Sequence, residues 1–129
     1  MATDYTIDPR LGLIRINYSG RVTVSEMYER RRHLMADLAY DRAFSQLIDA
    51  RSVITFEMNG FTIKRFAEEH VAAAGARRAI VMSRAPDLGL ARMFQIYREL
   101  AGGPEVTQIF DDIGKAIAWL GLPNKYNTK

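Results

Sequence analysis

The sequence predicts a single α/β domain with a mainly parallel sheet, an antiparallel hairpin at its start and about four helices. The chain has 129 residues, which is the usual size of one domain. Stretches with strand-like patterns alternate with stretches of helical spacing in the order β-β-α-β-α-β-α-β-α, and no repeat or linker divides them. We expect the domain to span residues 1–123 and the polar residues 124–129 to form a flexible tail.

The first two strands are expected at residues 5–8 and 13–19. Pro9 presets the backbone and Gly12 supplies a positive φ, so the residues between the strands are typical of a hairpin turn. In the second strand apolar and polar side chains alternate, which is typical of a sheet with one wetter face.

A helix is expected from a cap at Thr23 or Ser25 to about residue 39, because apolar residues up to Leu38 recur at helical spacing. A strand is expected at residues 44–50. Residues 51–59 are then expected to form a loop.

The second half of the chain alternates three helices with two strands. The strand at residues 79–82 is apolar at every position, which predicts burial on both faces. Asp111 or Asp112 stands where a helix needs an N-cap, so we interpret this pair as capping residues rather than catalytic carboxylates. The expected helices are 61–74, 86–101 and 113–120, and the last strand is 106–110.

The composition excludes several kinds of chemistry. The chain has no cysteine, which excludes disulfides, zinc–thiolate sites, iron–sulfur clusters and cysteine nucleophiles. Its two histidines are far apart, and no phosphate-binding glycine pattern or nucleophile elbow is present. We therefore expect no metal, no cofactor, no catalytic residue and no enzyme. An enzyme built from scattered residues such as Arg31, Asp49 and His70 is the remote alternative.

The net charge of +3 does not predict a nucleic-acid partner, because acidic residues interrupt the basic ones throughout the chain. No apolar run approaches the roughly 20 residues of a membrane span, so membrane contact is expected to be peripheral at most. The polar start of the chain lacks the features of a signal peptide, and we expect a cytoplasmic protein.

Two residues break the pattern of their helices. Arg31 falls in the middle of the apolar face of the first helix. Either its stem packs while the guanidinium reaches water or an acid, or it holds an anion at the rim of a pocket. His70 is flanked by apolar residues and is either a core histidine bonded to a carbonyl, or a ligand-binding or proton-sensing group.

A strand that ends in Asp49 is followed by Val53, Phe56, Glu57 and then Gly60, which opens a helix. This pattern resembles the STAS domains of anti-sigma factor antagonists, in which the stretch reads Asp-Leu-Ser-x-Val-x-x-Ile-Asp-Ser-Ser-Gly. The order of elements agrees over nearly the whole chain. Residues 89–94 and 118–120 also resemble the SpoIIAA-like, STAS/Sec14-like group of bacterial proteins. The resemblance implies a SpoIIAA-like fold.

The chain departs from this family at the position of its regulatory serine. In the antagonists a phosphorylated serine follows the acid directly, but Met58 and Asn59 occupy the two serine positions here. Neither a thioether nor an amide can be phosphorylated, so we expect the phospho-switch to be absent.

The candidate binding site lies at the carboxyl ends of the parallel strands, where α/β proteins bind ligands. We expect an apolar cleft between the second and third helices, with arginines that meet an anionic head group. The alternative is that most of these apolar residues fill the core. The candidate residues are Phe56, Met58, Asn59, Phe61, Arg84, Arg92, Met93 and Phe94.

Some proteins on the Sec14-like side of the resemblance bind lipids. The resemblance therefore implies a non-enzymatic module that binds a small apolar or amphipathic, lipid-like ligand near a membrane surface. The alternative is a regulatory module whose segment 56–61 docks a protein partner or a second copy of the chain.

Overall fold

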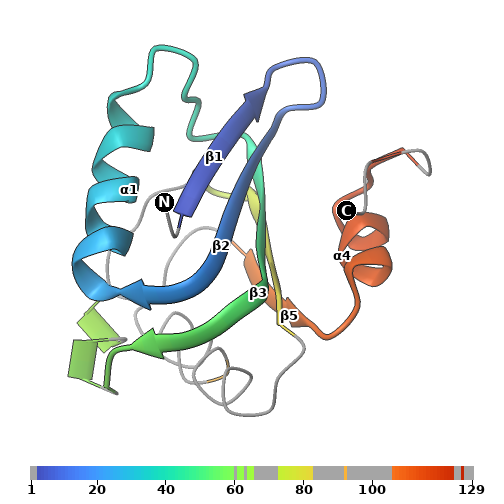
Figure 1. The fold of residues 1–129 in the computed structure, drawn as a ribbon. Coiled ribbons are helices and arrows are strands. Elements are labelled where there is room, and N and C mark those ends of the chain that lie inside the picture. Colours follow the sequence, from blue (N-terminus) through green and yellow to red (C-terminus); the bar gives the residue numbers. More distant parts are fainter. Residues whose placement is uncertain are drawn as a thin grey trace.

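The structure is a computed structural model that describes residues 3–59, 61–62, 64–65, 73–82, 92, 106–123 and 126. Within these residues it contains one five-stranded sheet and two complete helices (Figure 1). The elements are β1 (Thr3–Asp8), β2 (Leu13–Thr23), α1 (Val24–Ala36), β3 (Ser45–Glu57), β4 (Arg77–Val81), β5 (Val106–Phe110) and α4 (Ile113–Trp119).

The strands lie in the sheet in the order of the sequence, β1-β2-β3-β4-β5. β1 and β2 are antiparallel, whereas each later pair of neighbours is parallel. This arrangement confirms the predicted α/β class, with an antiparallel hairpin joined to a parallel sheet.

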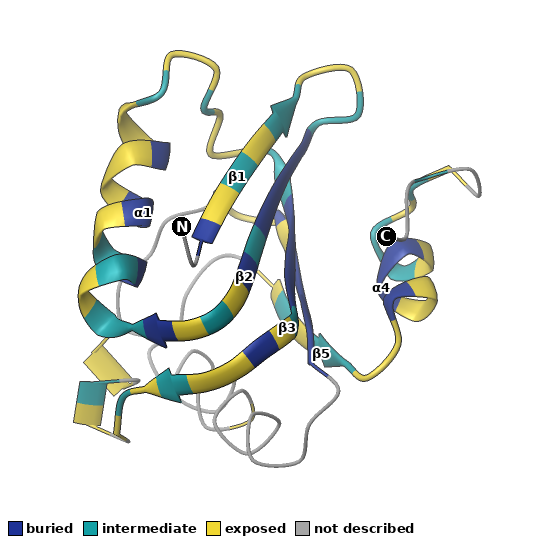
Figure 2. Cartoon of the chain, viewed as in Figure 1, coloured by how far each residue is buried: buried dark blue, intermediate teal, exposed yellow. Residues whose placement is uncertain are grey.

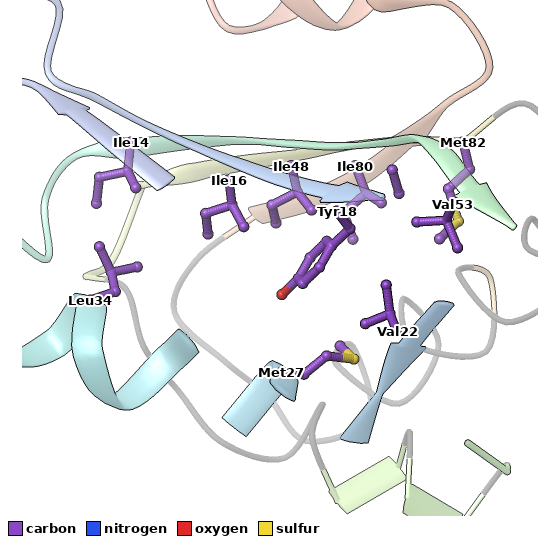
Figure 3. Packing of buried hydrophobic residues seen from close by; sticks show 11 residues of the cluster. Ile14, Ile16, Tyr18, Val22, Met27, Leu34, Ile48, Val53, Ile80 and Met82 are labelled. Atoms are coloured by element: carbon purple, nitrogen blue, oxygen red, sulfur yellow. The ribbon is translucent and has the colours of Figure 1, made fainter. Parts of the chain in front are cut away.

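The two helices pack on opposite faces of the sheet (Figures 1 and 2). We call these faces the α1 face and the α4 face. α1 packs mainly against β1 and β2, and α4 packs against β3, β4 and β5. Each face has its own buried apolar cluster, because successive residues of a strand point to opposite faces. Ile14, Ile48 and Ile80 belong to the α1 face (Figure 3), and Leu47 and Val81 belong to the α4 face.

The hairpin turn confirms the prediction at its glycine. Gly12 has a φ of 61°, a conformation that L side chains rarely adopt. The Asp8 carboxylate accepts hydrogen bonds from the backbone N–H groups of Arg10 and Leu11, at 3.0 and 3.3 Å. These bonds satisfy the turn locally, as aspartate often does.

The prediction of a loop at residues 51–59 is wrong for most of this range, because β3 continues to Glu57. β2 also continues, to Thr23, and the two strands stay paired in parallel up to Thr23 and Glu57. Each strand therefore supplies the hydrogen-bond partners of the other. β-Branched and aromatic residues such as Val53 and Phe56 favour this extended conformation.

The first helix ends earlier than expected. Its C-cap, Asp37, has an extended backbone, and its carboxylate accepts hydrogen bonds from the Tyr5 hydroxyl (2.8 Å) and the Ala39 N–H (2.9 Å). Leu38, which we expected on the apolar face of this helix, is fully exposed. The bonds to Asp37 end the helix before Leu38 could turn toward the core.

The described residues contain two complete helices rather than about four. The expected helices at 61–74 and 86–101 fall mostly outside the described residues. Within them, residues 61, 62, 64 and 65 are helical, as is Arg92. At the last helix the structure selects Asp112 as the N-cap, with its side chain accepting from the Gly114 N–H at 2.7 Å.

The start of α1 gives a direct test of the capping assignment. The Thr23 hydroxyl accepts from the Glu26 N–H at 3.1 Å, and the Glu26 carboxylate accepts from the Thr23 N–H at 3.0 Å. Replacing Thr23→Ala should lower the free energy of unfolding, measured in urea, by about 1 kcal/mol. Ser25→Ala, at the exposed residue that was the alternative cap, should change it by less than about 0.5 kcal/mol. Equal losses in both variants would contradict the assignment.

Candidate functional site

The candidate site lies where β2 and β3 continue beyond their neighbour β4. The pairing of β3 with β4 ends at Asp49 and Val81, whereas the pairing of β3 with β2 continues to Glu57. We call residues 19–23 and 52–57 the extension. Figure 1 shows both strands curving away from the rest of the sheet in this region.

Two irregularities in the pairing accompany this curvature. Between the pairs Asn17–Asp49 and Ser19–Ser52, β3 contains one residue more than β2, and the same occurs at Ile54. Such bulges bend a strand and increase its twist. Gly20, which lies between the two bulges, has a φ of 65° and provides the backbone freedom that the bend requires.

The predicted residues in the extension and just beyond it differ in exposure. Phe56 is half-buried, and its ring meets the Tyr18 ring edge-on with 6.1 Å between centroids. Met58 is half-buried and packs against the α1-face cluster. Phe61 is 68% exposed. Phe56 and Met58 therefore pack against the core, whereas Phe61 lies on the surface.

Ile54 is an exposed apolar residue that the sequence analysis missed. It is 67% exposed, although Val53 before it is buried and Phe56 after it is half-buried. Because we expected a loop here, the alternation of side chains between the two faces of a strand was not used to place Ile54. The bulge at Ile54 further breaks the alternation by which an outward-facing residue could be recognised.

Asn59 has a structural role in the described residues. Its side-chain oxygen accepts from the Thr62 N–H at 3.0 Å, and its own N–H donates to the Thr62 hydroxyl at 3.1 Å. These reciprocal bonds cap the helical residues that begin at Phe61. Thr62 therefore serves the start of this helix.

Four described basic side chains are exposed in the regions of the predicted site. Arg21, on the extension, forms an exposed ion pair with Glu57. Lys64 and Arg65 follow Phe61 and are exposed, and Arg92 is exposed as well. The other predicted site residues, His70, Arg84, Met93 and Phe94, lie outside the described residues, and so does most of the expected cleft between the second and third helices.

The first residue of the family-like pattern, Asp49, lies on the α4 face in a charged network. Its carboxylate accepts hydrogen bonds from Arg15 Nη2 (3.0 Å), Arg51 Nε (2.9 Å) and Arg51 Nη2 (2.8 Å). Arg15 Nε also donates to the Asn17 side chain at 3.1 Å, and the Tyr126 ring lies over the Arg15 guanidinium. The network joins β2 to β3 at the point where the extension begins.

These partners decide the charge of Asp49. Burial alone raises the pKa of this carboxyl, but the hydrogen bonds and charge of Arg51, with the hydrogen bond from Arg15, outweigh it. The pKa of Asp49 therefore lies below the ordinary value, and the carboxylate is ionised at neutral pH. A carboxylate held by two arginines has a structural role here rather than that of a general base.

A second polar cluster lies within the α1 face. Arg78 of β4 is buried, and its Nε donates to the Gln46 side chain at 3.1 Å. Arg31 of α1 is also buried, and it affects the titration of the Tyr18 and Tyr40 hydroxyls, as Arg78 does. The sequence analysis singled out Arg31 but missed Arg78. The signal was present, because residues 78, 80 and 82 must share one face of a strand.

The described residues contain no group of three or more acidic or histidine side chains that could hold a metal ion. None of the helices in the described ranges is long and apolar enough to cross a bilayer.

No family model matches the chain, and no curated protein matches it. Among solved structures, the chain is similar to an uncharacterised protein of the DUF3478 family with a SpoIIAA-like fold from Shewanella loihica PV-4. The two chains are 15% identical, with a TM-score of 0.59, and the match covers 92% of this chain and 94% of the other. This likeness confirms the SpoIIAA-like fold.

The Asp49 network predicts a dependence of stability on pH. A carboxyl with a lowered pKa in the folded state stabilises the fold above its unfolded pKa, and this contribution is lost as the pH falls through the folded pKa. Asp49→Asn should therefore lower the free energy of unfolding by about 2 kcal/mol at neutral pH. The difference in the free energy of unfolding between Asp49→Asn and the parent protein should become smaller as the pH falls below about 4.

The matched control is Glu57→Gln, which breaks the exposed ion pair with Arg21. This variant should lose less than about 1 kcal/mol of the free energy of unfolding at neutral pH. Urea denaturation over a pH series measures both variants. If the loss of stability in Asp49→Asn does not change with pH, the ionised Asp49 carboxylate is not the source of the stabilisation.

Proposed function

We propose that this SpoIIAA-like domain is a non-enzymatic binding module that takes up a small amphipathic, lipid-like ligand and works at the periphery of a membrane. The observation that carries the proposal is the exposure of two large apolar side chains, Ile54 and Phe61, in one short segment. Phe56 and Met58, in the same segment, are half-buried against the core. The segment therefore connects the protein surface with the apolar interior of the α1 face.

Burial of these exposed side chains gives a driving force for binding. Moving one phenylalanine or isoleucine from water to an apolar environment contributes roughly 1.5–3 kcal/mol. Lys64 and Arg65 add exposed positive charge close in the chain to Phe61. A combination of apolar and basic side chains is typical of proteins that bind at the surface of anionic membranes.

The phospho-switch of the anti-sigma factor antagonists is not part of this proposal. Met58 and Asn59 occupy the serine positions, and Asn59 is engaged as a helix cap. The module would therefore respond to its ligand and not to phosphorylation at these two positions.

The alternative is a regulatory module in which the segment 56–61 docks a protein partner or a second copy of the chain. The exposure of Phe61 is compatible with this alternative, since exposed apolar residues also mark protein interfaces. Molecular mass in solution, measured by light scattering, separates the two functions. A dimer that Met58→Asp splits would favour the alternative, whereas a monomer that binds lipid favours our proposal.

The central residue for the test is Phe61. Phe61→Ser should weaken binding to vesicles that contain anionic lipid by roughly tenfold, because the apolar contribution of the ring is lost. The matched control is Leu38→Ser, since Leu38 is a fully exposed apolar residue in the turn after α1. Co-sedimentation with vesicles measures both variants. Unchanged binding in Phe61→Ser, or an equal loss in Leu38→Ser, would contradict the proposal.

A further inference from the structure

The helical residues that follow β3 present three exposed side chains on one face. Residues 61, 62, 64 and 65 are helical (Figure 1). Phe61, Lys64 and Arg65 are exposed, whereas Thr62 is half-buried. Successive residues of an α-helix are rotated by roughly 100°, so residues 61, 64 and 65 lie within an arc of about the same width. One aromatic ring and two cations are therefore neighbours, and we call these three residues the Phe61 face.

The fold fixes the position of this helical turn. Met58, just before it, packs against the α1-face cluster. The Asn59 side-chain oxygen accepts from the Thr62 N–H at 3.0 Å, and the Thr62 hydroxyl donates to the Asn59 carbonyl at 2.9 Å. An N-cap fixes where a helix begins, so the turn is in place before a partner binds. Binding through a preorganised surface loses little free energy to ordering.

The two cations of the Phe61 face differ from Arg21, the exposed cation of the extension. Arg21 forms an ion pair with Glu57. Lys64 and Arg65 form no ion pair with another residue in the part of the chain that the structure describes. Their positive charge therefore favours a partner that carries negative charge.

We propose that the Phe61 face docks on the surface of an anionic phospholipid membrane, where Lys64 and Arg65 meet lipid phosphates and the Phe61 ring enters the boundary with the acyl chains. The inference rests on the proposed function and names the surface at which the module works. Amphipathic surfaces of this kind bind with their apolar side chains at that boundary. The long stems of lysine and arginine let their charges reach the phosphates while the ring is inserted.

A membrane suits this face better than a protein partner does. A specific protein interface involves roughly 20–30 residues on each side. Its buried centre is depleted of lysine, whereas Lys64 lies directly beside the Phe61 ring in the helical turn. A lipid surface needs no complementary shape, and anionic lipids attract each cation that comes near it. The size and the charge of the Phe61 face therefore favour a membrane.

Binding to vesicles of two compositions tests the inference. One kind contains phosphatidylcholine alone, and the other contains phosphatidylserine as well. The parent protein should bind the anionic vesicles more tightly by about thirtyfold, because each of two cations near an anionic surface contributes about fivefold. The double variant Lys64→Gln with Arg65→Gln should lose most of this preference. It keeps the acids that follow at residues 68 and 69, so the loss reports the two cations.

The matched control is Arg10→Gln with Arg42→Gln, which changes the net charge by the same amount. Both arginines are exposed. Arg10 lies just before β2 and Arg42 just before β3, and the first residues of these strands, Leu13 and Ser45, are paired. The control cations therefore lie at the end of the sheet opposite to Phe61, which follows β3. This variant should keep the full preference for anionic vesicles.

The outcomes separate the inference from the proposed function. If the parent protein binds both kinds of vesicle equally well, the module binds lipid but the anionic surface is refuted. If the Lys64 and Arg65 variant keeps the preference, or the control loses as much, the Phe61 face is refuted. If the parent protein binds neither kind, the proposed function fails and the inference fails with it. A dimer that Phe61→Ser dissociates, with no vesicle binding, would assign the face to a second copy and overturn the inference.

Discussion

The structure depends on the parallel pairing of β2 with β3, which is the longest pairing in the sheet. This pair joins the hairpin to the parallel strands, and the end of β2 provides Thr23, the cap that starts α1. Beyond Asp49 only β2 among the described strands pairs with β3, and two bulges bend the pair where this occurs. The same pairing therefore positions α1 and carries the apolar segment to the surface.

Buried charged side chains lie on both faces of the sheet. On the α4 face, Asp49 is bonded to Arg15 and Arg51, so a negative charge is compensated within the fold and stabilises it. On the α1 face, Arg78 is buried and its Nε donates to the Gln46 side chain, among other contacts.

Much of the fold could be predicted from the sequence, because strand order, hairpin and helix caps depend on local patterns such as Gly12, Thr23 and Asp112. The extension could not, because residues 51–57 are held in a strand by their pairing with β2, which is a long-range interaction. Phe61 and Met58 were found from the resemblance. Arg78 was missed because its partners, Tyr18 and Tyr40, are remote in the chain, although the alternation of β4 already placed it with Ile80.

The central claim is that the segment with the exposed side chains of Ile54 and Phe61 binds an amphipathic, lipid-like ligand. The most direct measurement is a crystal structure of the protein with a fatty acid brominated at the end of its chain, located by the anomalous scattering of bromine. We predict that the fatty acid lies against the exposed side chains of Ile54 and Phe61. A fatty acid bound only at another surface, or no bound fatty acid, would contradict the account.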